Sequence, residues 1–367
     1  MCRHRVVFIG IVSLIFLIGC SSSDSPDEKS ADSSTIKQSQ NKYIIAVVGS
    51  GVSSTTRPQE PTYARSVAAG ESIMRGIRTA FYNSTQCREI NAFIDLDSLD
   101  TGARIDIAKE RAQALQKEPR VLAVIGHVTS GETRAAAPIY AEAGIPLIIP
   151  IGVSVTTVLP PNTPDSSSER FTNYLRVLPN TKWQAHALAY YVKTLADSVK
   201  GPFRCDLISD TSSGVYEYSK FLSKEVSMLL DKLGLIYKTR EINSDNTGAM
   251  LDVARLIAQD KVSAVIYCGY STSAPNFLGD LKEAFSENGS TTVPGGRPKV
   301  ILTSACLNPK TPLAPQGFDV SLLFPLPDID SLPKKSSEDW NLLNNAIKDS
   351  PGQSYEIAGY AAMRILA

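Results

Sequence analysis

The chain has 367 residues, and its 37 lysines and arginines balance 37 aspartates and glutamates, which gives a formal net charge of +0. This balance excludes the large basic field on which nucleic-acid binding depends. Residues 42–367 are too many for one hydrophobic core and predict two domains.

The first twenty residues are typical of an export signal. A basic start at residues 3–5 precedes an apolar run over 6–18, which is too short to span a bilayer. The run ends in Leu17-Ile18-Gly19-Cys20 and resembles the lipobox of bacterial lipoproteins. The resemblance implies that the Cys20 sulfur takes a diacylglycerol and that Cys20 becomes the mature N-terminus; an ordinary signal peptide is the alternative. Several acyl chains on one cysteine, palmitate among them, would anchor the exported protein stably to the periplasmic or outer face of a membrane.

Residues 21–41 form a polar segment rich in Ser, Asp, Lys and Gln, with too few apolar side chains to fold. A flexible chain of this length reaches on the order of 25 Å root-mean-square. We expect this segment to tether the folded part to the membrane.

Short β-branched runs then alternate with helical patterns. The strand-like runs are residues 43–48, 90–96, 121–125 and 147–149. The first helix between them carries apolar residues on one face, at Ile73, Ile77, Ala80 and Phe81. The second and third helices are marked by Ile105, Ala108, Ala112 and Leu115, and by residues 132–143. This order predicts parallel strands with right-handed crossovers.

A Pro- and Ser-rich loop interrupts the pattern, and we expect a hinge at residues 162–174. The alternation then restarts, with strands at 205–208, 235–239, 262–267 and 300–302 and helices at 183–195 and 216–232. A run at 322–324 looks like a strand leading back, and 338–348 and 355–366 look helical. We therefore predict an α/β protein of two doubly wound parallel-sheet lobes, one formed by 42–168 with 326–367 and the other by 169–325.

Ligands of open parallel sheets bind beyond the carboxyl ends of the strands. The loops expected at those ends are rich in glycine and hydroxyls: residues 49–56, 126–131, 150–154, 209–213, 269–273 and 303–305. Such loops offer backbone N–H groups and hydroxyls to a small polar ligand but few acids or bases. Ser130, directly before a predicted helix, fits a helix cap and also a binding site for an anion at the helix N-terminus.

The cysteines of the folded part are Cys87, Cys205, Cys268 and Cys306. None forms a Cys-x-x-Cys pair, so a metal or redox motif is not indicated. An exported protein can link two of them, but Cys205 and Cys268 lie in apolar strand-like runs that suit buried free thiols equally well.

The segments AVIGHVTS (123–130) and IYAEAGIP (139–146) are similar to the corresponding stretch of the leucine/isoleucine/valine-binding proteins, the branched-chain amino-acid group of type I periplasmic binding proteins. Looser similarity covers 175–180, 262–269 and 355–362, so the resemblance extends from Tyr43 to the end of the chain. It implies a binding protein without a cofactor, whose two lobes close over a small-molecule ligand and deliver it to an ABC transporter permease.

The resemblance also implies a ligand site. A ligand carboxylate would be held by Thr129, Ser130 and Gly131. Further contacts would come from Ile151, Gly152, Val153 and Ser154, and from Tyr216 or Tyr270 in the second lobe. The family often has threonine where Val153 stands, so Ser154 is expected to replace that hydroxyl.

Two departures from the family pattern bear on function. The family's acidic acceptor for an amino group has no counterpart in residues 303–306, which argues against a plain α-amino acid unless Asp210 serves. Amides, urea-like solutes and carboxylates stay open. The family also usually continues beyond the helix matching 355–366, so we expect a truncated C-terminus.

Two alternatives to transport remain. The segment Gly269-Tyr270-Ser271-Thr272-Ser273 approaches the nucleophile elbow of hydrolases but lacks its last glycine, and His127 is the candidate base. The sequence carries no phosphate-binding Gly-x-x-x-x-Gly-Lys loop and no His-Glu-x-x-His. A sensory module would have the same fold with a signalling partner.

Overall fold

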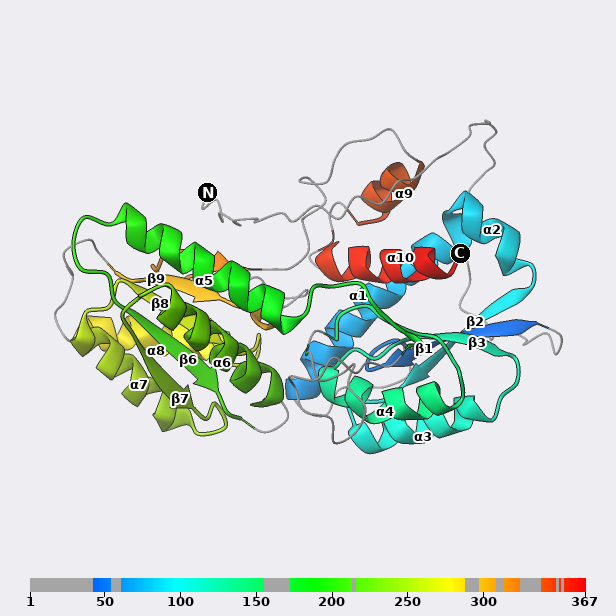
Figure 1. Cartoon of the computed structure of the whole chain (residues 1–367), viewed down its shortest axis with the longest axis horizontal. Coiled ribbons are helices and arrows are strands. Elements are labelled where there is room, and N and C mark those ends of the chain that lie inside the picture. The colour runs from blue at the N-terminus through cyan, green and yellow to red at the C-terminus, as the bar shows by residue number, and fades with distance from the viewer. Residues whose placement is uncertain are drawn as a thin grey trace.

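The computed structural model describes residues 42–53, 61–152, 154, 172–212, 216–287, 297–307, 313–323, 338–347, 350 and 353–367. The expected export signal, Cys20 and the tether lie outside these residues. The described chain forms two α/β lobes side by side, each built on a five-stranded parallel sheet (Figure 1). This confirms the predicted fold class. In this part of the chain, no helix has both the length and the apolar character needed to cross a membrane.

The first sheet contains β1 (Tyr43–Gly49), β2 (Ile94–Asp100), β3 (Val121–Gly126), β4 (Leu147–Ile149) and β5 (Tyr174–Arg176), in the order β2-β1-β3-β4-β5. Its helices are α1 (Pro61–Asn83), α2 (Thr85–Asn91), α3 (Ile105–Gln116), α4 (Ser130–Glu142), α9 (Glu338–Ile347) and α10 (Gln353–Leu366). Side chains of β1 alternate between two cores, because successive residues of a strand face opposite sides. Ile45 and Val47 pack with α1, α9 and α10, whereas Ile44 and Val48 pack with α3 and α4.

Helices α1 and α10 lie side by side (Figure 1), although they are far apart in the sequence. Two glycines permit their close approach. A Cβ at Gly76 would lie 2.0 Å from the Glu356 carbonyl oxygen, and one at Gly359 would lie 2.1 Å from that of Ile73. Arg75 also pairs with Glu356 at 2.6 Å. These contacts attach the C-terminal helix to the first lobe.

The second sheet contains β6 (Cys205–Asp210), β7 (Tyr237–Ile242), β8 (Ala264–Cys268), β9 (Lys299–Leu302) and β10 (Val320–Leu322), in the order β10-β9-β8-β6-β7. Helices α5 (Thr181–Ser198) and α6 (Tyr216–Lys232) pack on one face. Helices α7 (Thr247–Asp260) and α8 (Ala274–Glu287) pack on the other. A short 3-10 turn, η2 (Ser304–Cys306), follows β9.

Three expectations about the elements are corrected. The strand expected at 90–96 is the end of α2 followed by β2, so its apolar start belongs to a helix. The three residues of β5, assigned from the sequence to the end of the hinge and to the second lobe, pair with β4 in the first sheet. The strand expected at 322–324 to lead the chain back is instead β10, at Val320–Leu322. It pairs with β9 and completes the second sheet.

Described residues of the two lobes come into contact around the loop after β4, the residue after β5, and α10. Ile151 and Val177 are partly buried and pack against the cores of both lobes. The Tyr355 hydroxyl on α10 donates to the Leu307 carbonyl at 3.5 Å, and Ala358 of the same helix packs in the second lobe's core. The loop that carries Ile151 therefore lies where the lobes join.

Candidate functional site

The first-lobe site begins at the N-terminus of α4. Thr129, not Ser130, is the N-cap: its hydroxyl accepts the Glu132 N–H at 3.3 Å, and the Glu132 carboxyl accepts the Thr129 N–H at 3.1 Å. The expectation that Ser130 caps the helix is therefore wrong by one residue. The capping box commits the Thr129 hydroxyl to the helix and leaves Ser130 and Gly131 as its first two residues.

Ser130 bridges two loops instead. Its hydroxyl oxygen accepts the Ser154 N–H at 3.3 Å, and Arg176 of β5 donates to the Ser154 carbonyl at 2.9 Å. Gly152 fits tightly in the same loop, because a Cβ there would lie 2.9 Å from the Ile149 side chain and 3.0 Å from the Thr133 hydroxyl. The structure thus brings together Ser130, Gly152 and Ser154, three of the residues predicted to bind a ligand. Val153 lies outside the described residues.

Two titratable side chains lie beneath this site. Glu132 is fully buried, bonds the hydroxyls of Thr101 and Thr129, and has its pKa raised by burial. His127 is also fully buried, with its Nε2 atom 3.3 Å from the Tyr140 hydroxyl. Burial lowers the pKa of His127 to about 3, so the ring is neutral at physiological pH. Both side chains lie in the buried interior of the first lobe and bond other protein side chains.

The second-lobe site gathers polar side chains where β8, β9, α5 and α6 meet. Ser271 N–H donates to the Ala305 carbonyl at 2.9 Å, which joins the loops after β8 and β9. The buried hydroxyl of Tyr218 donates to the Gln184 side-chain oxygen at 3.0 Å and lies 3.1 Å from the Ser304 hydroxyl. The ring of Tyr270 meets that of Tyr218 edge-on, with ring centroids 5.8 Å apart.

The aromatic contacts expected in this lobe are only partly described. Tyr270 is 9% exposed and lies at the edge of this cluster. Tyr216 is the first residue of α6, but its side chain lies outside the described ones. Tyr218 and Gln184 were not among the residues predicted for this site. Their contacts join α5, α6 and η2, which are far apart in the sequence, so no local pattern indicated them.

Asp210, the alternative acceptor for an amino group, is fully buried at the end of β6. Its Oδ1 atom accepts from the Ser212 N–H at 3.1 Å and from the Ser244 hydroxyl at 3.0 Å. Its Oδ2 atom accepts from the hydroxyls of Ser273 at 2.7 Å and Tyr267 at 3.3 Å. Both carboxylate oxygens are therefore occupied by the protein itself.

The serine and the histidine of the hydrolase alternative lie in different lobes. Ser271 lies beyond the second sheet and His127 at the end of a first-sheet strand, and His127 bonds Tyr140. Among the described residues, the hydroxyls of Ser50, Thr181 and Ser271 are buried and have no hydrogen-bond partner. An activated serine needs a base within hydrogen-bond reach, and Ser271 has none in this part of the chain.

The four cysteines of the folded part are free and buried. Burial raises the pKa of Cys205 to about 12 and that of Cys268 further. The open question between bridge and free thiols is thus decided for free thiols.

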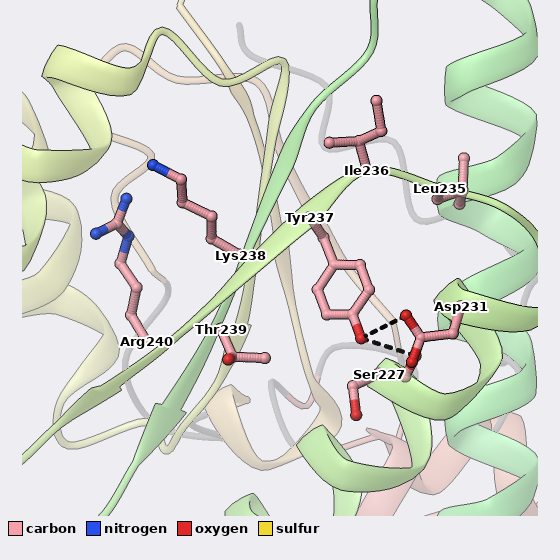
Figure 2. A pocket seen from close by; sticks show the side chains of 8 residues that line it. All are labelled: Ser227, Asp231, Leu235, Ile236, Tyr237, Lys238, Thr239 and Arg240. Atoms are coloured by element: carbon pink, nitrogen blue, oxygen red, sulfur yellow. Dashed lines mark hydrogen bonds between the residues drawn. The ribbon is translucent and has the colours of Figure 1, made fainter.

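A surface hollow runs along the edge strand β7 in the second lobe (Figure 2). The Tyr237 hydroxyl donates across it to the Ser227 carbonyl at 3.2 Å and to Asp231 at 3.0 Å. The lining residues are Ser227, Asp231, Leu235, Ile236, Tyr237, Lys238, Thr239 and Arg240. None belongs to the predicted ligand site.

Comparison with known proteins decides the family. Residues 69–291 match the family described as periplasmic binding protein. The chain belongs to this family. The matched range includes the loops after β3, β4, β6 and β8, where most of the predicted ligand-binding residues lie. A search of curated proteins found no match.

Solved periplasmic binding proteins share the fold. A leucine-binding protein LivK from Thermotoga maritima superposes with a TM-score of 0.65 and 19% identity over 88% of this chain and 81% of its own. The isoleucine complex of LivJ from Streptococcus pneumoniae has a TM-score of 0.64 and 15% identity over 89% and 82% of the two chains. A solute-binding protein of an ABC transporter from Rhodopseudomonas palustris, in complex with 3,4-dihydroxybenzoic acid, has a TM-score of 0.62 and 14% identity over 89% and 80%.

Proposed function

We propose that the chain is an extracytoplasmic solute-binding lipoprotein that captures a small polar solute by closure of its two lobes and delivers it to an ABC transporter. The observation that carries this proposal is the family match over residues 69–291, which includes strand-end loops of both lobes. Two lobes, each with its own sheet and core, suit hinge closure around a ligand. The expected lobes are residues 42–168 with 326–367, and 169–325, with β5 transferred to the first.

The first lobe would bind the anionic or polar end of the solute. The N-terminus of α4 carries a partial positive charge and free N–H groups, which favour an oxygen acceptor. Because the Ser130 oxygen accepts the Ser154 N–H, the Ser130 hydroxyl hydrogen remains to donate to the solute. Thr129, Gly131, Ile151, Gly152 and Val153 would contribute backbone and shape to the same subsite.

The second lobe would bind the rest of the solute through Tyr270 and the polar groups around it. The buried Ser271 hydroxyl without a protein partner supports a polar contact there. The occupied oxygens of Asp210 favour a solute without an ammonium group, because a buried ammonium needs a carboxylate partner. Carboxylates and amides therefore fit better than α-amino acids. Of the relatives named above, one is bound to an aromatic carboxylic acid and another to isoleucine.

A thermal-shift panel tests this proposal. The purified protein is mixed with 3,4-dihydroxybenzoate, 4-hydroxybenzoate, acetamide, urea, L-leucine and L-isoleucine, and the unfolding midpoint is recorded. A ligand at one hundred times its Kd stabilises the folded state by about 2.7 kcal/mol. Saturable stabilisation by a carboxylate or amide is the expected result. Hydrolytic turnover of a panel compound, lost on Ser271→Ala, would replace this proposal with the hydrolase.

Lipid anchoring at Cys20 is the second part of the proposal. Cys20 lies at the end of the apolar run in the sequence, and the polar segment that follows suits a tether. Full-length protein expressed with radiolabelled palmitate should incorporate label and sediment with membranes, whereas Cys20→Ala should not incorporate it. Equal labelling of both proteins contradicts the anchor without affecting solute binding.

The partner protein to which the chain binds distinguishes transport from sensing. Crosslinking in the native membrane should recover a permease subunit with the protein, and more of it when ligand is present. Recovery of a kinase or chemoreceptor instead favours the sensory alternative, in which the same site signals to a partner.

A further inference from the structure

Asp210 occupies a particular place at the carboxyl edge of the second sheet. It is the last residue of β6, and its side chain is fully buried. An isolated carboxylate in such a place is costly, and only several hydrogen bonds offset the cost. The donors to Asp210 therefore indicate what the carboxylate holds in place.

The donors come from three separate loops. Ser212 follows β6, Ser244 follows β7, and Ser273 follows β8. Ser212 donates its N–H to Oδ1 at 3.1 Å, and Ser244 donates its hydroxyl to the same atom at 3.0 Å. Ser273 donates its hydroxyl to Oδ2 at 2.7 Å. One carboxylate thus ties together the ends of three neighbouring strands.

The contacts continue from Asp210 to the ligand loop. The Ser273 hydroxyl oxygen accepts the Tyr270 N–H at 3.4 Å, and Tyr270 directly precedes Ser271. The Tyr267 hydroxyl lies 2.7 Å from the Ser273 hydroxyl oxygen and 3.3 Å from Asp210 Oδ2, while its ring stacks on Phe277. The backbone of residues 270 and 271 is therefore held through Ser273 by the Asp210 carboxylate.

A second buried aspartate on the same strand provides the contrast. Asp206 lies four residues earlier, at the other end of β6, and pairs with Arg240 of β7 at 2.6 Å. Arg240 also pairs with Asp260. Asp206 supports the sheet through the neighbouring strand, and none of these contacts involves the loops after β6 or β8.

From this geometry we propose that Asp210 is a positioning residue of the solute site: it contacts no ligand, and it fixes the loops that present Tyr270 and Ser271. This inference rests on the proposed function for its effect on binding. Its effect on the loops does not depend on any ligand. Asp210→Ala removes the acceptor for all three serines, whereas Asp210→Asn keeps one oxygen and places an amide that donates to hydroxyl oxygens.

The experiment compares Asp210→Ala, Asp210→Asn and the control Asp206→Ala in the full chain. Hydrogen–deuterium exchange measures the amides of residues 211–212, 243–246 and 269–273. Calorimetry with L-leucine and with 4-hydroxybenzoate measures affinity. We expect Asp210→Ala to speed amide exchange in these loops about tenfold and to lower the affinity for the probe about tenfold. Asp210→Asn should fall between Asp210→Ala and the wild type.

Asp206→Ala should lower the unfolding midpoint and leave loop exchange and probe affinity within about twofold of the wild type. Unchanged exchange in Asp210→Ala, or the same changes in Asp206→Ala, overturns the positioning role. If Asp210→Ala does not fold, Asp210→Asn is judged by the same criteria. If neither probe binds the wild type, neither compound is a ligand of the site, and the exchange pattern alone decides the role of Asp210.

Discussion

Ser130 and Ser154 join two strand-end loops of the first lobe, since the Ser130 hydroxyl oxygen accepts the Ser154 N–H at 3.3 Å. Ser130→Ala removes this acceptor together with the hydroxyl proposed to meet the solute. We expect binding to weaken by about 1–3 kcal/mol if the solute group is charged. Titration calorimetry with the best ligand of the thermal-shift panel measures the change. Ser198→Ala, at the exposed end of α5, is the matched control, and an affinity of Ser130→Ala equal to that of this control removes Ser130 from the site.

Substitutions at Thr129 test the stability of α4 separately from solute binding, which is assigned to the neighbouring Ser130. Thr129→Ala removes the N-cap and half of the capping box of α4, so we expect the free energy of unfolding to fall by about 1 kcal/mol. Thr129→Ser keeps a capping hydroxyl and should retain most of the stability. Urea unfolding of both variants measures the effect. A loss in Ser130→Ala as large as in Thr129→Ala would show that the cap is not specific to Thr129.

The sequence predicted the two sheets well because their strands carry a strong local pattern. Ile44 to Val48 alternate between two cores, and the apolar face of α1 is continuous at Ile73 and Ile77. Strand β5 was missed because Tyr174–Arg176, at the edge of the sheet, lacks the continuous apolar run that marks the equally short β4, and only pairing with β4 defines it.

The contacts within the candidate site were predicted less completely than the fold, for two physical reasons. Thr129 and Ser130 both carry hydroxyls, and a one-residue difference in the start of α4 decides which is the cap. The contacts of Asp210 join positions up to 63 residues apart in the sequence, so no local pattern reveals them. Glycine-rich, hydroxyl-rich loops predict where a ligand binds; which side chains support those loops depends on tertiary packing.

Gly269, at the start of the loop after β8, leaves no room for a side chain. A Cβ there would lie 2.3 Å from ring atoms of Tyr267, whose ring is stacked on Phe277. Gly269→Ala should therefore displace Tyr267 and lower the free energy of unfolding by about 1–3 kcal/mol. The control is Gly279→Ala in α8, where a Cβ meets nothing within 4 Å and a helical alanine should stabilise by about 0.5–1 kcal/mol. Chemical denaturation distinguishes the two, and a neutral Gly269→Ala would contradict the contact.

The buried ring of His127 makes the free energy of unfolding depend on pH. The folded protein holds its pKa at about 3 because the ring is buried, whereas the unfolded chain has the ordinary value of about 6.5. Between these values the unfolded state binds a proton that the folded state does not, so the free energy of unfolding decreases as pH falls below about 6.5. The slope from this residue approaches about 1.4 kcal/mol per pH unit.

His127→Gln isolates this contribution, because glutamine can still bond the Tyr140 hydroxyl but does not titrate. We expect the variant to be less stable than the wild type at pH 7.5, since its side chain packs less well in a closed interior. That difference should shrink as the pH is lowered to 5, because only the wild type loses stability through this ring. Urea unfolding at pH 7.5, 6.5, 5.5 and 5 provides the comparison, in which the other titrating groups are shared and cancel. A difference that stays constant over this range would mean that His127 takes up its proton equally in both states, and that the ring is reached by water in the folded lobe.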